Sequence, residues 1–169
     1  MRIITENEAR GWLSANALPN PSASPVESGF MHQSGFKIPG DAGRKTALAR
    51  LVCQQIGADD REGLYWVLGY GIWPSSENPS LFEAVRESLG ESRPLAEAPC
   101  HVFHAIDRQV LQWLIALSLY FSWDATLFAP NRKLIVKLSH DEVLQVFERG
   151  VAGSSGLPAA FEEFGLSSV

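Results

Sequence analysis

The residue types most capable of chemistry gather in one stretch, WDATLFAPNRKLIVKLSHDE, at positions 123–142. The stretch holds Asp124, the adjacent pair His140 and Asp141, and Glu142. Imidazole and carboxylate groups at short spacing can transfer protons or bind a divalent metal ion. The first question is therefore whether these residues form an active site or serve the local structure.

The end of the stretch has a local structural explanation. Ser139 lies three residues before Glu142, and the apolar run VLQVF follows, which is the pattern of a helix capping box. Asp141 and Glu142 would then lie in the first turn, where acidic residues are favoured by the helix dipole. The pattern predicts a helix from His140 to about Arg149. It explains Ser139, Asp141 and Glu142 as structural residues and leaves His140 without a local role.

The start of the stretch reads as a β-hairpin closed by the four-residue connection APNR at positions 129–132. Pairing outward from that connection sets Asp124 opposite Lys137. The same pairing places the apolar residues of both strands on one shared face of the hairpin. We expect that face to be buried. Asp124 and Lys137 are therefore expected to be a cross-strand ion pair with a structural role.

A metal-dependent hydrolase is the enzymatic alternative. It would use His140 and Asp141, joined by His101 or His104, and nothing in the spacing requires these residues to converge. Two other motifs are weak. CHVFH follows a proline and alternates like a strand, which would separate its Cys and His by ~13 Å. GDAGRKT lacks the spacing of a phosphate loop. We therefore expect no catalytic residues, no metal and no cofactor.

The elements around this stretch predict an α+β fold, with a small, mainly antiparallel sheet that contains the C-terminal hairpin and packs against several helices. Thr5 and Asp41 are expected to cap two N-terminal helices, and GLYWVLG at 63–69 reads as a strand. Residues 19–40 are rich in Pro, Ser and Gly and are expected to form a long irregular loop. Residues 150–169 are expected to form a C-terminal tail that ends in a short helix.

The composition sets the class of protein. A chain of 169 residues that is 46% hydrophobic and 20% charged fits one globular domain over residues 1–169. Its net charge is -5 and its basic residues are dispersed, which argues against nucleic acid and is compatible with a basic protein partner. The longest apolar run is too short to cross a membrane, and the start has no apolar leader. Two dispersed cysteines favour a reducing, cytoplasmic setting.

With these residues in view, the C-terminal half resembles a group of small, mostly uncharacterised bacterial proteins, some of which accompany polymorphic toxins as immunity proteins. The likeness rests on LFEAVRESLGESRPLAEAPCHVF, FSWDATLF and LIVKLSHDE and covers residues 64–147. The resemblance implies a cytoplasmic α+β protein that blocks a cognate toxin by binding it and performs no chemistry. The leading hypothesis is therefore a non-enzymatic immunity or inhibitor protein. A self-associating assembly factor is a third option.

Contact surfaces for such a partner are expected in loops on a rigid scaffold. The loops at 19–40 and 73–78 are the candidates, because both carry large side chains among Pro, Ser and Gly. The residues singled out for partner binding are Phe30, Met31, Trp73, Glu77 and His140.

Overall fold

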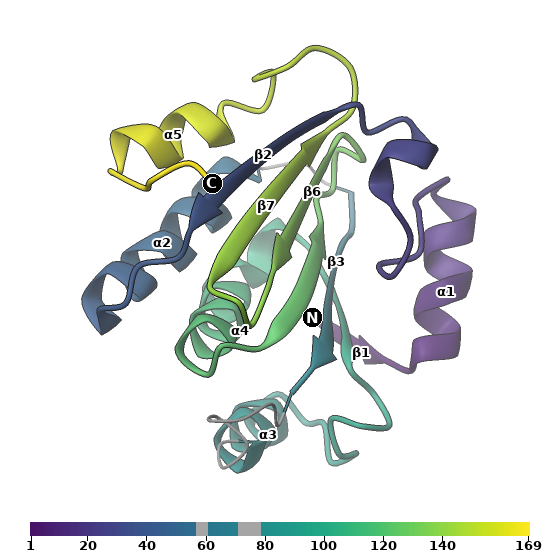
Figure 1. The fold of residues 1–169 in the computed structure, drawn as a ribbon. Helices are drawn as coiled ribbons and strands as arrows, with labels where there is room; N and C mark the ends of the chain where they lie inside the picture. The colour runs from purple at the N-terminus through teal and green to yellow at the C-terminus, as the bar shows by residue number, and fades with distance from the viewer. Residues whose placement is uncertain (57–60, 71–78) are drawn as a thin grey trace.

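The computed structural model describes residues 1–56, 61–70 and 79–169. Within them, seven strands form one antiparallel sheet in the order β1-β4-β3-β5-β6-β7-β2 (Figure 1). The strands are β1 (Arg2–Ile4), β2 (His32–Lys37), β3 (Gly63–Gly69), β4 (Cys100–Phe103), β5 (Asp124–Phe128), β6 (Leu134–Leu138) and β7 (Val143–Glu148). The predicted α+β fold with a mainly antiparallel sheet is confirmed.

Five α-helices accompany the sheet in the described residues: α1 (Glu6–Ala15), α2 (Ala42–Gln55), α3 (Pro79–Ser88), α4 (Arg108–Tyr120) and α5 (Leu157–Glu163). Thr5 caps α1, because its side chain accepts from the Glu8 N–H while the Glu8 carboxylate accepts from the Thr5 N–H. Asp41 caps α2 by accepting from the Arg44 N–H at 2.8 Å. Both predicted caps are confirmed.

Both faces of the sheet are covered by other parts of the chain, so consecutive residues of its central strands are apolar. One face packs against α2, α4 and α5 and includes Tyr65, Val67 and Trp123. The opposite face packs against α1 and includes Trp66 and Phe128. Figure 1 shows α4 behind the sheet, α2 toward the left of the view and α1 at the right.

The segment at 19–40 is not the irregular loop that its composition predicted. It contains a short 3₁₀ helix, Pro25–Ser28, and the whole of β2, an edge strand that pairs along its length with β7. Its outer edge is covered by the C-terminal tail, where the Lys37 N–H donates to the Ser167 carbonyl at 2.9 Å. The loop prediction was wrong because composition does not register pairing with distant segments: Ser34 and Gly35 lie in a strand that β7 and the C-terminal tail hold from both sides.

The hairpin of β5 and β6 forms, but its register differs by two residues from the prediction. Thr126 lies opposite Lys137, and the connection closes where the Ala129 N–H donates to the Leu134 carbonyl at 3.0 Å. An even shift keeps every side chain on its predicted face, so the apolar set is still buried. The expected pairing of Asp124 with Lys137 is wrong.

The helix predicted from His140 to Arg149 is also wrong, because that segment forms a tight turn and β7. The Glu142 N–H donates to the Ser139 carbonyl at 3.1 Å and the Ser139 N–H to the Val143 carbonyl at 2.9 Å. Glu142 has a φ of 59°, which completes a three-residue hairpin loop. Ser139 accepts from the Asp141 N–H at 3.2 Å, a contact that serves a turn as well as a helix start.

Candidate functional site

The structure brings Asp124, His140 and Asp141 together at the end of the β6–β7 turn. The His140 Nδ1 lies 2.9 Å from the Asp124 Oδ1, and the His140 Nε2 lies 3.5 Å from the Asp141 Oδ1. The His140 backbone N–H also donates to the Asp124 Oδ1 at 2.8 Å. The hydrogen bond and charge of Asp124 raise the pKa of the His140 imidazole.

This arrangement favours a structural His140. A general base needs a ring nitrogen with a lone pair turned toward a substrate. Here both ring nitrogens face carboxylates, which favours the doubly protonated imidazolium. His140 thereby ties the β6–β7 turn to the first residue of β5, which gives it the local role that the sequence left open.

The residues required by the hydrolase alternative lie apart. His101 is wholly buried in β4, two strands away from β5 in the sheet. His104 follows β4 and lies 3.4 Å from the Glu62 carboxylate. No set of three His, Cys, Asp or Glu side chains suited to a metal ion occurs in the described part of the chain. His140 and Asp141 therefore have no third ligand from these histidines.

The other predicted contact residues have different outcomes. Phe30 is 0% exposed and packs into the core beside α1, so it cannot be a contact residue on the surface. Phe30 lies just before β2, and the pairing of β2 with β7 holds this part of the chain against the sheet. Met31 is 74% exposed and stays a candidate. Trp73 and Glu77 lie outside the described residues.

Lys137 takes a role that the predicted register concealed. Its Nζ donates to the Pro21 carbonyl at 2.8 Å and lies 5.6 Å from the centre of the Phe147 ring. Burial lowers the pKa of its ammonium group. Lys137 therefore fastens the segment around Pro21 to the sheet.

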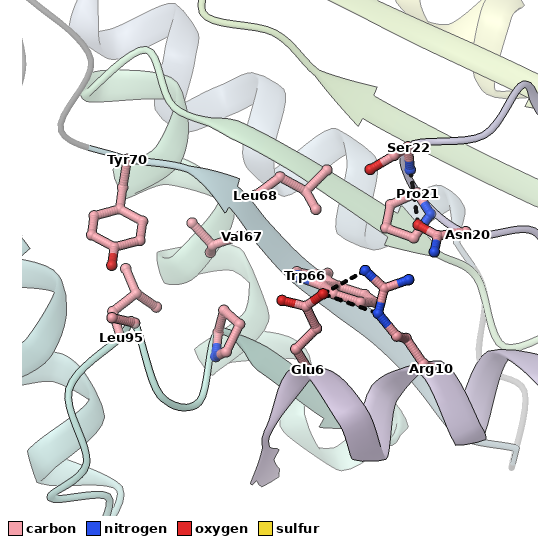
Figure 2. Close-up of a pocket in the computed structure, with 12 residues that line it drawn as sticks. Glu6, Arg10, Asn20, Pro21, Ser22, Trp66, Val67, Leu68, Tyr70 and Leu95 are labelled. Atoms are coloured by element: carbon pink, nitrogen blue, oxygen red, sulfur yellow. Dashed lines mark hydrogen bonds and ion pairs between the residues drawn. The ribbon is translucent and has the colours of Figure 1, made fainter.

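That segment forms one wall of a pocket of about 340 Å³ between α1, β3 and the irregular segment 95–99 that leads into β4 (Figure 2). Its lining residues come from four parts of the sequence: Glu6, Arg10, Asn20, Pro21, Ser22, Trp66, Val67, Leu68, Tyr70, Leu95, Ala96 and Pro99. Apolar side chains and a few polar groups face the same space, which is typical of binding sites.

The pocket lies where β3 continues beyond its neighbour. β4 pairs with β3 only from Gly63 to Trp66. One further contact joins them, from the Val67 N–H to the Pro99 carbonyl at 3.1 Å. Pro99 has no N–H to return, so the ladder ends there. On this side, Leu68 and Gly69 have no strand partner among the described residues, and Leu68 is 40% exposed.

A polar pair lies at the rim of the pocket, where both side chains are about half exposed. The Arg10 Nε donates to the Glu6 carboxylate at 2.9 Å, one helical turn away on α1. The Arg10 guanidinium lies 5.8 Å from the centre of the Trp66 ring, within range of a cation–π contact. Figure 2 shows both side chains in front of the Trp66 ring. Across the space, the Asn20 side chain accepts from the Ser22 N–H at 3.1 Å and shapes the turn at Pro21.

A second hollow of about 280 Å³ adjoins the first and shares Arg10 and Asn20 with it. It continues along α1 past Leu13 and Ser14. The two together make an elongated groove beside α1. Sequence reasoning missed this groove, because its walls meet only in the folded chain. The one local signal was Pro99, which directly precedes the first residue of β4.

A comparison with protein-family models, with curated proteins and with solved structures found no match to this chain. In the described residues, no helix combines the length and apolar character needed to cross a bilayer.

Proposed function

We propose that this protein is a non-enzymatic binding protein that holds an extended segment of a protein partner in the groove beside α1. One observation carries the proposal: β3 continues past its pairing with β4, so that on this side Leu68 and Gly69 have no strand partner among the described residues, at a pocket of about 340 Å³. A free strand edge can pair with an added strand, which gives affinity through the backbone and specificity through pockets for alternate side chains.

The shape of the groove supports an extended occupant. Two adjoining hollows share Arg10 and Asn20, so the space follows α1 from Glu6 to Ser14, as an extended segment would. Its side chains also suit a peptide. Leu68, Pro21 and Pro99 offer apolar surface, while the Glu6–Arg10 pair and Ser22 offer hydrogen bonds at the rim.

The identity of the partner is a narrower proposal. The resemblance of residues 64–147 to immunity proteins favours a bacterial toxin as the partner and a cytoplasmic site of action. The net charge of -5 favours a basic partner through electrostatic steering.

The decisive experiment selects binding peptides from a displayed library of random linear peptides, with the purified protein as target. The selected peptide is then titrated by calorimetry against the protein and two variants. Leu68→Lys places a charge at the free edge and is expected to weaken binding at least ~10-fold, a change of about 1.4 kcal/mol. Leu81→Lys is the matched control, because Leu81 on α3 is 52% exposed and does not line the groove.

Equal binding by the wild type and Leu68→Lys would contradict the groove as the site. Failure to select any peptide would contradict an extended occupant. The toxin proposal has a separate test, in which the tagged protein captures partners from lysate. A single captured toxin that Leu81→Lys retains and Leu68→Lys loses would support both proposals.

A further inference from the structure

Arg86 is a buried cation whose charge is unpaired in the described structure. It lies on α3, and its side chain is 0% exposed. Its Nη2 donates to the Ala98 carbonyl at 2.7 Å, whereas Nε and Nη1 have no hydrogen-bond partner. A buried charge is strongly unfavourable unless it is paired and hydrogen-bonded.

The nearest carboxylates are engaged elsewhere. Glu83 accepts from the Leu95 N–H at 3.2 Å, and Glu91 accepts from the Arg93 Nε at 2.8 Å. Neither makes an ion pair with Arg86 in the described residues. Burial lowers the pKa of Arg86, and the charges of Glu91 and Glu83 raise it from longer range. The guanidinium therefore stays charged, because an arginine is not deprotonated in proteins.

Two further buried side chains that carry N–H groups pack against Phe82, the neighbour of Arg86 on α3. Phe82 lies one turn before Arg86 on α3, and its ring centre is 5.9 Å from that of His101 and 5.2 Å from that of Trp123. The Nε1 of Trp123 is buried without a hydrogen-bond partner. The ring nitrogens of His101 are also buried and make no well-aligned hydrogen bond, although the backbone of Tyr65 and of Pro99 lies close to the ring. Burial, with the charge of Arg86, lowers the pKa of His101 to about 3, so the ring is neutral.

The unmet hydrogen-bonding capacity under α3 is therefore mostly that of donors, next to a positive charge. We propose that the core under α3 binds a small monovalent anion of halide size, held by the Nε and Nη1 of Arg86 beside His101 and Trp123. An anion accepts several N–H bonds at once and neutralises the guanidinium, which a water molecule does not. A halide is favoured over a larger anion because all three side chains are fully buried.

The test compares thermal unfolding of the full chain in sodium chloride and in sodium gluconate at equal ionic strength. Gluconate is too large for the buried site. A ligand that binds only the folded state raises the Tm with its concentration. Above its dissociation constant, chloride is expected to raise the Tm by about 3–5 °C for each tenfold increase. Arg86→Met should abolish this dependence, whereas Arg50→Met, which changes an exposed arginine, should retain it.

A second measurement keeps the proposal testable if Arg86→Met does not fold. Crystals of the wild-type protein grown in sodium bromide should show an anomalous peak beside the Arg86 guanidinium. The same Tm in chloride and gluconate, with no such peak, would overturn the proposal and assign the donors to internal water. A rise in Tm with sodium formate and none with chloride or bromide would also overturn it, in favour of a carboxylate ligand.

Discussion

His140 contacts the Asp124 carboxylate twice. The Nδ1 of its ring lies 2.9 Å from the Asp124 Oδ1, and its backbone N–H donates to the same oxygen at 2.8 Å. This contact joins the turn between β6 and β7 to the start of β5. The imidazole is doubly held because Asp141 faces its other nitrogen. The residue that seemed the best candidate for catalysis thus serves to fix a turn.

The His140 contact predicts a pH-dependent stability. Because Asp124 raises the pKa of His140 in the folded protein, the contribution is complete below the unfolded pKa of about 6.5 and is lost as pH rises through the higher folded value. His140→Gln should therefore lower the Tm more near pH 5.5 than near pH 9. Scanning calorimetry across this range checks it, and Asp124→Asn should show the same loss. A constant difference at all pH values would refute the ion pair.

The turn at Glu142 gives a prediction that separates a hairpin from a helix. With a φ of 59°, Glu142 is in the left-handed region that glycine adopts without strain. Glu142→Gly should therefore stabilise the protein by about 0.5–1 kcal/mol in urea unfolding. In the helix that the sequence predicted, the same change would destabilise it by a similar amount. Asp141→Gly should gain no stability, because Asp141 is not in the left-handed region and the change also removes the carboxylate that faces His140.

At Gly63 there is no room for a side chain, because the Phe103 ring occupies the place of a Cβ. The two residues lie opposite each other in β3 and β4, and a Cβ at position 63 would lie 2.2 Å from the Phe103 Cζ. Gly63→Ala should therefore cost about 1–3 kcal/mol of unfolding free energy. Adding Phe103→Leu should recover part of this loss, because it removes the colliding ring. A double-mutant cycle in urea would measure this coupling, and additive effects would argue against direct contact.

Glu148 fastens the segment that leads to α5. Its carboxylate accepts from the N–H groups of Gly153 and Ser155, both at 2.8 Å. Burial raises the pKa of Glu148, but the hydrogen bonds from Ser155 and Gly153 outweigh it, and the net pKa is lowered. The contribution is therefore present above the unfolded pKa of about 4.3 and is lost as pH falls through the folded value.

Glu148→Gln should accordingly cost about 1.5–3 kcal/mol near pH 7, the range for hydrogen bonds to charged groups. The cost should shrink near pH 3, where the wild-type carboxylate gains a proton. Urea unfolding at both pH values measures it. Glu162→Gln on α5 is an exposed control that should have little effect.

The patterns that depend on neighbours in the chain were predictable. Thr5 and Glu8 form the expected capping box, because that motif needs only three consecutive peptide units beyond the cap. The faces of β5 and β6 were also predictable, because alternation along a strand decides which side chains are buried. The α+β fold follows from such elements.

Patterns with two local solutions were not predictable. Ser139 and Glu142 fit a helix cap and a hairpin turn equally well, and only pairing of β7 with β6 and β2 selected the turn. The register of β5 and β6 failed for the same reason. A shift of two residues leaves every face unchanged, so burial could not select between the two registers.

The sequence by itself determined where the chain forms most of its helices and strands and which face of the β5–β6 hairpin is buried. Only the tertiary structure decided where the candidate sites lie. The groove joins Arg10, Asn20, Leu68 and Pro99, and the buried donors join Arg86, His101 and Trp123. These residues are far apart in the chain, and strand order and packing between elements bring them together, which no local pattern encodes.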